Sequence, residues 1–134
     1  MIDAFDADCL IYAAADGHPL GQKVAALFGD GSDQVRIGST VLIPELLTKP
    51  IREHRTEELR RLGFYLARLD LRPADQAVAN LAATLGARYR LRAADAIHLA
   101  TAVQHGADRF ITNNRRDFDS EQVIEIDVTY PDNL

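Results

Sequence analysis

Short apolar segments alternate with longer amphipathic segments along the whole chain, and this alternation restricts the folds open to it. Brief apolar runs favour strands, whereas apolar residues at every third or fourth position favour helices. We expect strands over residues 2–5, 35–37, 69–71, 109–112 and 123–128. We expect helices over residues 10–15, 19–28, 42–47, 55–69, 74–85 and 93–105. Alternating strands and helices predict an α/β fold, with helices on both faces of a parallel sheet of four to five short strands.

Glycine and proline mark the expected ends of several helices. Gly29 and Gly31 follow the second expected helix, Gly86 follows the fifth and Gly106 follows the last. Glycine is common at these positions because it adopts left-handed backbone angles without steric cost. Pro50 lies between the third and fourth expected helices, where we expect it to break or kink the chain.

The composition predicts one domain that covers residues 1–134. The chain is 47% hydrophobic and 26% charged, and no linker or repeat divides it. Its single cysteine, Cys9, excludes an internal disulfide and is expected to serve packing. No apolar stretch approaches the ~20 residues of a membrane span, and the first residues are acidic where a signal peptide would be basic. We therefore expect a cytoplasmic protein that does not contact membranes.

The net charge of -5 argues against a protein that coats nucleic acid by bulk electrostatics. Such proteins usually carry a strong excess of basic residues. A nuclease whose acidic residues bind metal remains compatible with this charge.

Four acidic residues lie in apolar, small-residue surroundings: Asp6, Glu45, Asp95 and Asp117. A buried carboxylate without a partner is costly, so repeated acids in apolar runs indicate a cation or a catalytic role. Asp6 follows the first expected strand and Asp117 follows the fourth, and in a parallel sheet these strand ends share one edge. Asp95 and Glu45 lie near helix starts that can face the same edge.

Carboxylate oxygens suit Mg²⁺ or Mn²⁺, whereas the histidines and the cysteine show no zinc-like spacing. Each acid also has a structural interpretation when taken alone. Asp95 would cap its helix, Glu45 would be an exposed helical residue and Asp117 would lie in a solvated turn. His98 is a candidate catalytic base, although a hydrogen-bonded core histidine is the favoured interpretation on so apolar a helix.

Four stretches together resemble the PIN domain family, and most of all the VapC-type toxins of toxin–antitoxin pairs. They are FDADCLIYA, the glutamate of VLIPELL, AADAIHLATA and FITNNRRDF. The resemblance spans almost the whole chain in order. It implies a three-layer α/β/α sandwich and a metal-dependent endoribonuclease that hydrolyses RNA phosphodiesters with metal-activated water. It further implies a homodimer and inhibition by an antitoxin protein.

The resemblance also assigns site residues. Asp6, Glu45 and Asp95 match the first three acids of the family, and Thr112 matches a hydroxyl residue that bonds near the site. Many members place an aspartate two residues after this threonine, but this chain has Asn114 there.

This departure leaves two possibilities. Either Asp117 completes the site, with Asn114 holding a metal-bound water, or a second metal binds weakly. Asp8 is expected to supplement the acidic cluster. Arg92, Arg115 and Arg116 flank the acidic motifs and are candidate RNA contacts.

Two alternative functions fit parts of the pattern. A PIN fold with weakened chemistry would serve as a scaffold for RNA or a partner protein, and Asn114 favours that interpretation. A haloacid-dehalogenase-type phosphatase would use Asp6 and Asp8 as its acidic pair. Such an enzyme also needs a lysine well downstream, yet the only lysines are Lys23 and Lys49.

Overall fold

The computed structural model describes residues 1–29 and 34–134. Its strands are β1 (Ile2–Phe5), β2 (Val35–Ser39), β3 (Asp70–Arg72), β4 (Arg109–Ile111) and β5 (Asp127–Thr129). Its helices are α1 (Ala7–Ala14), α2 (Pro19–Ala26), α3 (Leu42–Arg52), α4 (Thr56–Leu66), α5 (Gln76–Tyr89) and α6 (Ala93–Gln104), followed by the short 3-10 helix η1 (Pro131–Asn133). The predicted alternation of strands and helices is confirmed.

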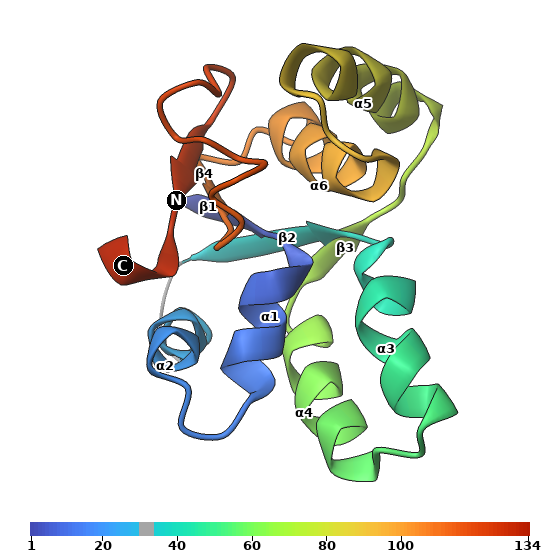
Figure 1. The fold of residues 1–134 in the computed structure, drawn as a ribbon, viewed down its shortest axis with the longest axis vertical. Coiled ribbons are helices and arrows are strands. Elements are labelled where there is room, and N and C mark those ends of the chain that lie inside the picture. The colour runs from blue at the N-terminus through green and yellow to red at the C-terminus, as the bar shows by residue number, and fades with distance from the viewer. Residues whose placement is uncertain (30–33) are drawn as a thin grey trace.

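All strand pairs in the sheet are parallel, in the order β3-β2-β1-β4-β5. The chain first moves outward from β1 to β3 and then crosses back to β4. Right-handed crossovers in opposite directions place their helices on opposite faces of the sheet. Figure 1 shows this result, with α1, α2, α3 and α4 below the sheet and α5 and α6 above it. The predicted α/β layers are therefore confirmed.

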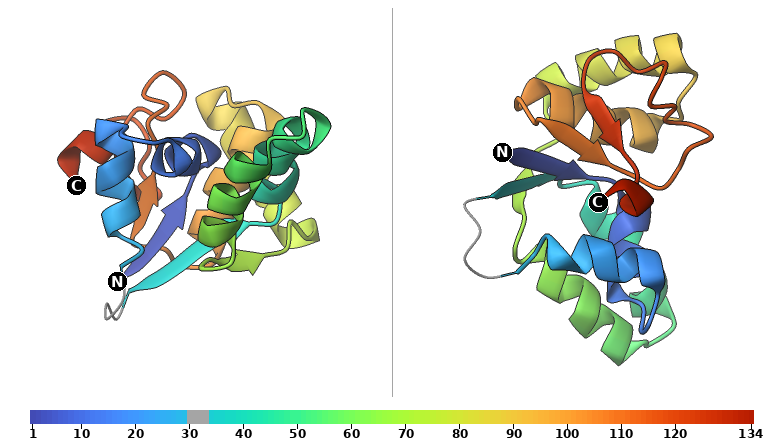
Figure 2. Two further views of the ribbon diagram at one scale, coloured as in Figure 1. Left: turned by 90° about the horizontal axis from the view of Figure 1, so that it is seen from below. Right: turned by 90° about the vertical axis from the view of Figure 1, so that its left-hand side faces the viewer.

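Two hydrophobic cores fill the spaces between these layers. The first lies under α5 and α6 and includes Val78, Leu99 and Phe110. The second lies under α1 to α4 and includes Leu10 and Leu42. Figure 2 shows the two helical layers separated by the sheet. The central strand β1 is covered on both faces, with Ala4 buried in the first core and Phe5 in the second.

The order of the strands indicates where a ligand site is expected in a parallel sheet of this kind. The direction of the chain reverses between β1 and β4, whose residues Phe5 and Ile111 are paired in register. At such a switch point the loops beyond the strands diverge and leave a crevice at the carboxyl edge of the sheet. Asp6 and Thr112, which directly follow these two strands, therefore lie at this edge.

The structure corrects the expected break at Pro50. Helix α3 continues through Pro50 to Arg52, and the turn comes at His54, whose φ is 55°. A proline within a helix lacks an N–H donor and its ring crowds the carbonyl four residues earlier, but its own carbonyl can still accept. The Pro50 carbonyl here accepts a hydrogen bond from the Arg55 N–H at 2.9 Å. Pro50 therefore lies within the C-terminal end of α3 and not between two helices.

The end expected at Gly86 is also wrong. Helix α5 continues to Tyr89 and ends at Arg90, whose φ is 56°. Gly86 instead faces α6, because a Cβ placed on it would lie 3.4 Å from the Cβ of Ala96. The glycine permits close helix packing. Gly31 lies outside the described residues.

Two further boundaries differ from the expectation. Helix α1 begins at Ala7, earlier than the apolar run 10–15, because Asp6 caps it. Strand β5 covers only Asp127–Thr129 of the expected 123–128 segment. Val123 and Ile126 are buried in the core without strand pairing, so their apolar character reflects packing. Within the described residues, no helix has both the length and the apolar character needed to cross a membrane.

Candidate active site at the carboxyl edge of the sheet

Asp6 occupies the switch point between β1 and β4. Its backbone N–H donates to the Ile111 carbonyl at 2.9 Å, which extends the pairing of the two strands by one residue. Its Oδ1 accepts from the Ala7 N–H at 2.9 Å and its Oδ2 accepts from the Thr112 hydroxyl at 2.8 Å. Asp6 is only 4% exposed. The buried strand ends and the helix cap therefore hold its carboxylate in one orientation.

Burial and a neighbouring acid make Asp6 difficult to ionise. Burial, followed by the charge of Asp8, raises the pKa of Asp6 from 3.8 to about 7, against the lowering influence of His98 and Thr112. Burial also raises the pKa of Asp8, although Asp8 accepts from the Asn113 N–H at 3.2 Å. A cation placed beside this pair would stabilise both carboxylates in their charged forms.

Asp95 lies in the first turn of α6 and is half-buried. Burial raises its pKa most, and the charges of Asp117 and Glu45 raise it further. Arg92, at the start of the same helix, opposes this shift. Acids from α3, α6 and the loop after β4 therefore lie within electrostatic range of one another.

Asn114 and Asp117 bond to each other in both directions. The Asn114 side-chain amide donates to Asp117 Oδ2 at 2.9 Å, and the Asp117 N–H donates to Asn114 Oδ1 at 3.2 Å. The Asn114 N–H also donates to the Thr112 hydroxyl at 3.1 Å. Within this loop, Asn114 orients the Asp117 side chain.

Glu45 meets His98 across the sheet edge. The His98 Nε2 and Glu45 Oε1 atoms lie 3.1 Å apart, and the His98 side chain is 0% exposed. Burial disfavours a charged imidazole, yet the hydrogen bond to Glu45 and the charge of Asp6 leave the pKa of His98 raised. The favoured interpretation of His98 as a hydrogen-bonded core histidine is confirmed. Its partner was not predicted.

The sequence profile of the PIN domain family matches residues 4–120, which include every site residue described above. The chain belongs to the PIN domain family. Curated protein sequences yield no match.

Solved structures of toxin–antitoxin proteins share the fold of this PIN domain. A chain of the toxin–antitoxin complex from Klebsiella pneumoniae has a TM-score of 0.73 at 24% identity, with 98% of both chains covered. A chain of VapBC2 from Rickettsia felis, bound to a promoter DNA fragment, has a TM-score of 0.76 at 15% identity, with 97% of this chain and 98% of that chain covered. VapC20 from Mycobacterium tuberculosis, a sarcin-ricin loop cleaving toxin, has a TM-score of 0.65 at 15% identity, with 95% and 99% covered. Because these identities are all below 25%, the similarity establishes the fold alone.

The acidic edge of this PIN domain has the donor chemistry of a Mg²⁺ or Mn²⁺ site. Carboxylate and amide oxygens are the ligands these ions prefer, and the pKa values of Asp6 and Asp95 are raised by burial first and by neighbouring acids second. Within residues 1–29 and 34–134, however, no group of three or more His, Cys, Asp or Glu side chains is arranged to hold a metal ion. Carboxylates repel one another when no cation lies between them. The donor atoms of these acids and of Asn114 are therefore of the type that such an ion binds, although they are not arranged around one.

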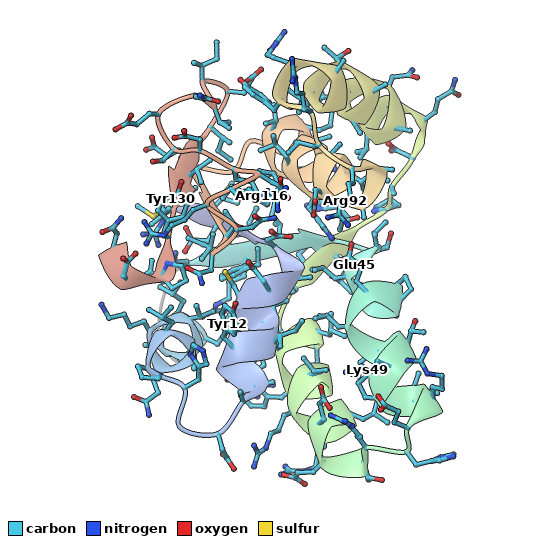
Figure 3. The ribbon with its side chains drawn as sticks, in the orientation of Figure 1. Tyr12, Glu45, Lys49, Arg92, Arg116 and Tyr130 are labelled. Carbon is cyan, nitrogen blue, oxygen red and sulfur yellow. The ribbon has the colours of Figure 1, made fainter. Side chains whose placement is uncertain are left out.

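The three candidate arginines differ in their surroundings. Arg115 lies over the Tyr130 ring, 4.1 Å from its centroid, and pairs with Asp132. Arg92 and Arg116 are exposed. Figure 3 shows Arg92 and Arg116 above Glu45 in that view. Arg92 is close enough to Asp95 to oppose the rise in the pKa of that carboxyl.

Two other sequence predictions concern buried side chains. Cys9 is fully buried, and burial, together with the charges of Asp8 and Asp6, raises the pKa of its thiol. Its predicted packing role is confirmed. For His98, the available sequence signal was its spacing of three residues from Asp95, which places the two on neighbouring turns of one helix face.

Proposed function

We propose that this PIN domain is a divalent-metal-dependent endoribonuclease and the toxin of a toxin–antitoxin pair. One observation carries the proposal: acids from separate chain segments interact at one edge of the sheet. Beyond the effect of burial, Asp8 raises the pKa of Asp6, and Asp117 and Glu45 raise that of Asp95. Such mutual repulsion destabilises the fold, and a cation bound between the carboxylates would offset it.

The acids act together in the proposed site. Asp6, Asp95 and Glu45 would hold Mg²⁺ or Mn²⁺, and Asp117 would add a fourth carboxylate to the same ion site. Asn114 orients Asp117 and binds through water. When bound, such an ion lowers the pKa of a water molecule and offsets the negative charge of the phosphate.

The other residues position this site. The Thr112 hydroxyl holds the Asp6 carboxylate in place, and Asp8 adds negative charge beside it. Arg92 and Arg116 contact the RNA phosphates. They do not compete with the acids, because the acids bind the ion and the arginines bind phosphate groups. Arg115 contributes less, because it is already paired with Asp132.

The partners are proposed from the fold and its relatives. The Klebsiella pneumoniae structure is a toxin–antitoxin complex, and VapC20 is a toxin that cleaves the sarcin-ricin loop. We infer an antitoxin protein and an RNA substrate for this chain, with a homodimer as its assembly. The phosphatase alternative has lost its support, because the chain belongs to the PIN family and Lys23 Nζ donates to the backbone carbonyl of Asp132 near the C-terminus.

Cleavage of an RNA pool in the presence of Mg²⁺ or Mn²⁺ tests the catalytic proposal. We expect metal-dependent cleavage that Asp95→Asn reduces at least about tenfold. Asp75→Asn is the matched control, because Asp75 caps α5 through its side chain and an asparagine keeps that cap. A wild-type protein that cleaves no RNA with either ion would leave the scaffold alternative.

Growth of cells that express the protein alone tests the toxin role. We expect expression without an antitoxin to slow growth, and Asp6→Ala to relieve the effect. Equal growth inhibition by the wild type and by this variant, at equal protein levels, would contradict a toxin that acts through this site.

A further inference from the structure

We propose that His98 is a positioning residue that holds the Glu45 carboxylate toward the metal-binding acids. This inference rests on the proposed function, because it assigns Glu45 to the metal site. His98 is not itself one of the proposed metal-binding acids.

The two residues approach from opposite faces of the sheet. Glu45 belongs to α3, whose buried residues pack in the lower core, and His98 belongs to α6, which packs in the upper core. Their side chains nevertheless meet, with 3.1 Å between Nε2 and Oε1. The contact bridges the two layers at the edge where Asp6 and Asp95 lie.

Glu45 needs an external partner to take one conformation. Its side chain is 29% exposed and lies in the first turn of α3. A glutamate in such a position keeps considerable rotamer freedom, and ordering it costs conformational entropy. The His98 side chain is 0% exposed, so its ring is fixed by the core around it. A fixed donor restricts the carboxylate before any ion arrives.

The unpaired nitrogen of His98 separates this role from simple packing. A carboxylate only accepts hydrogen bonds, so the bond to Glu45 requires the proton on Nε2. The other ring nitrogen, Nδ1, is buried with no hydrogen-bond partner among the described residues. An apolar side chain of similar size would fill the space without leaving a buried polar atom unpaired. The core alone therefore gives no reason for a histidine here, whereas Glu45 does.

Three substitutions at His98 separate positioning from packing. In His98→Gln the terminal amide nitrogen can occupy the place of Nε2, but in His98→Asn it reaches only as far as Nδ1. His98→Leu suits the apolar surroundings and cannot donate, so it serves if His98→Asn folds poorly. The measurement is the Mn²⁺ dissociation constant of the folded protein, determined by titration and accompanied by a urea unfolding curve for each variant.

We expect His98→Asn and His98→Leu to weaken Mn²⁺ binding about 10- to 100-fold, as is typical when the partner of a metal ligand is removed. His98→Gln should stay nearer to the wild type. In a Glu45→Ala background, which removes the acceptor, the same His98 substitutions should add little, because the bond they remove is already absent. Unchanged Mn²⁺ affinity in folded His98→Leu would overturn the role, and so would an undiminished effect in the Glu45→Ala background.

A metal-free readout keeps this proposal distinct from the proposed function. Imidazole ¹⁵N shifts should report the Nε2–H form of His98 in the wild type and change in Glu45→Ala, which removes the acceptor. Glu58→Ala is the control, because Glu58 lies on α4 and pairs with the exposed Arg55. Unchanged His98 shifts in Glu45→Ala would show that the contact does not form in solution. If the His98 shifts change as expected in the Glu45 variant but the wild-type protein binds no Mn²⁺, the contact exists. In that case both the metal site and the positioning role would be overturned.

Discussion

Thr112 donates a hydrogen bond to the buried carboxylate of Asp6 at 2.8 Å, and the two residues directly follow the two strands between which the sheet reverses direction. The same hydroxyl accepts from the Asn114 N–H at 3.1 Å. One side chain thus links the first acid of the site to the loop that carries the last. The stability of the fold and the geometry of the site depend on the same contact.

Replacing the Thr112 hydroxyl should destabilise the protein more than shortening the side chain does. Thr112→Val leaves a buried carboxylate and a backbone N–H each short of one partner, which costs about 2–3 kcal/mol. Thr112→Ser keeps the hydroxyl and loses one methyl group, at about 1 kcal/mol. Urea unfolding at pH 8 measures both. Equal losses in the two variants would contradict the role of the hydroxyl.

The free energy of unfolding should fall as the pH rises from about 4 to about 7. The pKa of folded Asp6 is raised from 3.8 to about 7, chiefly by burial, so the folded state binds more protons than the unfolded state in that window. Asp6→Asn should remove the share that Asp6 contributes, on the order of 2–4 kcal/mol across the window. The raised pKa values of Asp8, Asp95 and His98 should leave the remainder of the dependence in place. The comparison requires urea curves with a metal chelator at several pH values. Parallel pH profiles for the two proteins would argue against a buried, raised Asp6.

Divalent ions should raise the melting temperature. An ion that binds only the folded state stabilises it by about 2.7 kcal/mol at a hundredfold excess over Kd, or roughly 10 °C for a domain of this size. Asp95→Asn should reduce the shift and Asp75→Asn should preserve it. Thermal scans with Mg²⁺, Mn²⁺ and no added metal provide the measurement. An unchanged melting temperature at millimolar concentrations of both ions would count against the proposed site.

Asp117 should matter more for metal binding than the asparagine that orients it. Asp117→Ala removes a proposed ligand and should weaken Mn²⁺ binding about 10-fold or more, whereas Asn114→Ala removes only its partner and should have a smaller effect. Asp119→Asn is the control, because Asp119 accepts from the Glu121 N–H within the following turn. If Asn114→Ala weakens binding and Asp117→Ala does not, the asparagine is the ligand instead.

Two glycines should respond to alanine in opposite directions. A Cβ on Gly21 would lie 1.9 Å from the Tyr12 carbonyl oxygen, so Gly21→Ala must push α1 and α2 apart, at about 3 kcal/mol or more. Gly63 lies within α4 with nothing within 4 Å of its Cβ position, so Gly63→Ala should stabilise the protein by about 0.5–1 kcal/mol. Unfolding curves distinguish the two. Similar effects of both substitutions would contradict the close approach of α1 and α2.

Local patterns predicted most of the secondary structure and missed the details that depend on distant residues. Among the described residues, the apolar periodicity located the five strands and the six α-helices but not η1, because the signal lies within a few neighbouring residues. We expected a break or kink at Pro50, and the break is wrong. The strand expected over 123–128 is correct only toward its end. Pro50 lies within a helix end whose hydrogen bonds the sequence pattern does not show, and Val123 is apolar because it packs in the core. Patterns of burial do not distinguish pairing from packing.

Residue patterns were enough to predict the α/β class and the parallel sheet, and they indicated the candidate acids, since strand ends in such a sheet share one edge. Which side chains meet at that edge is known only from the folded chain. Thr112 reaches Asp6 across a sequence separation of 106, and His98 reaches Glu45 across a separation of 53. Contacts of this kind depend on the strand order and on how the helical layers pack against the sheet, and no local periodicity records either.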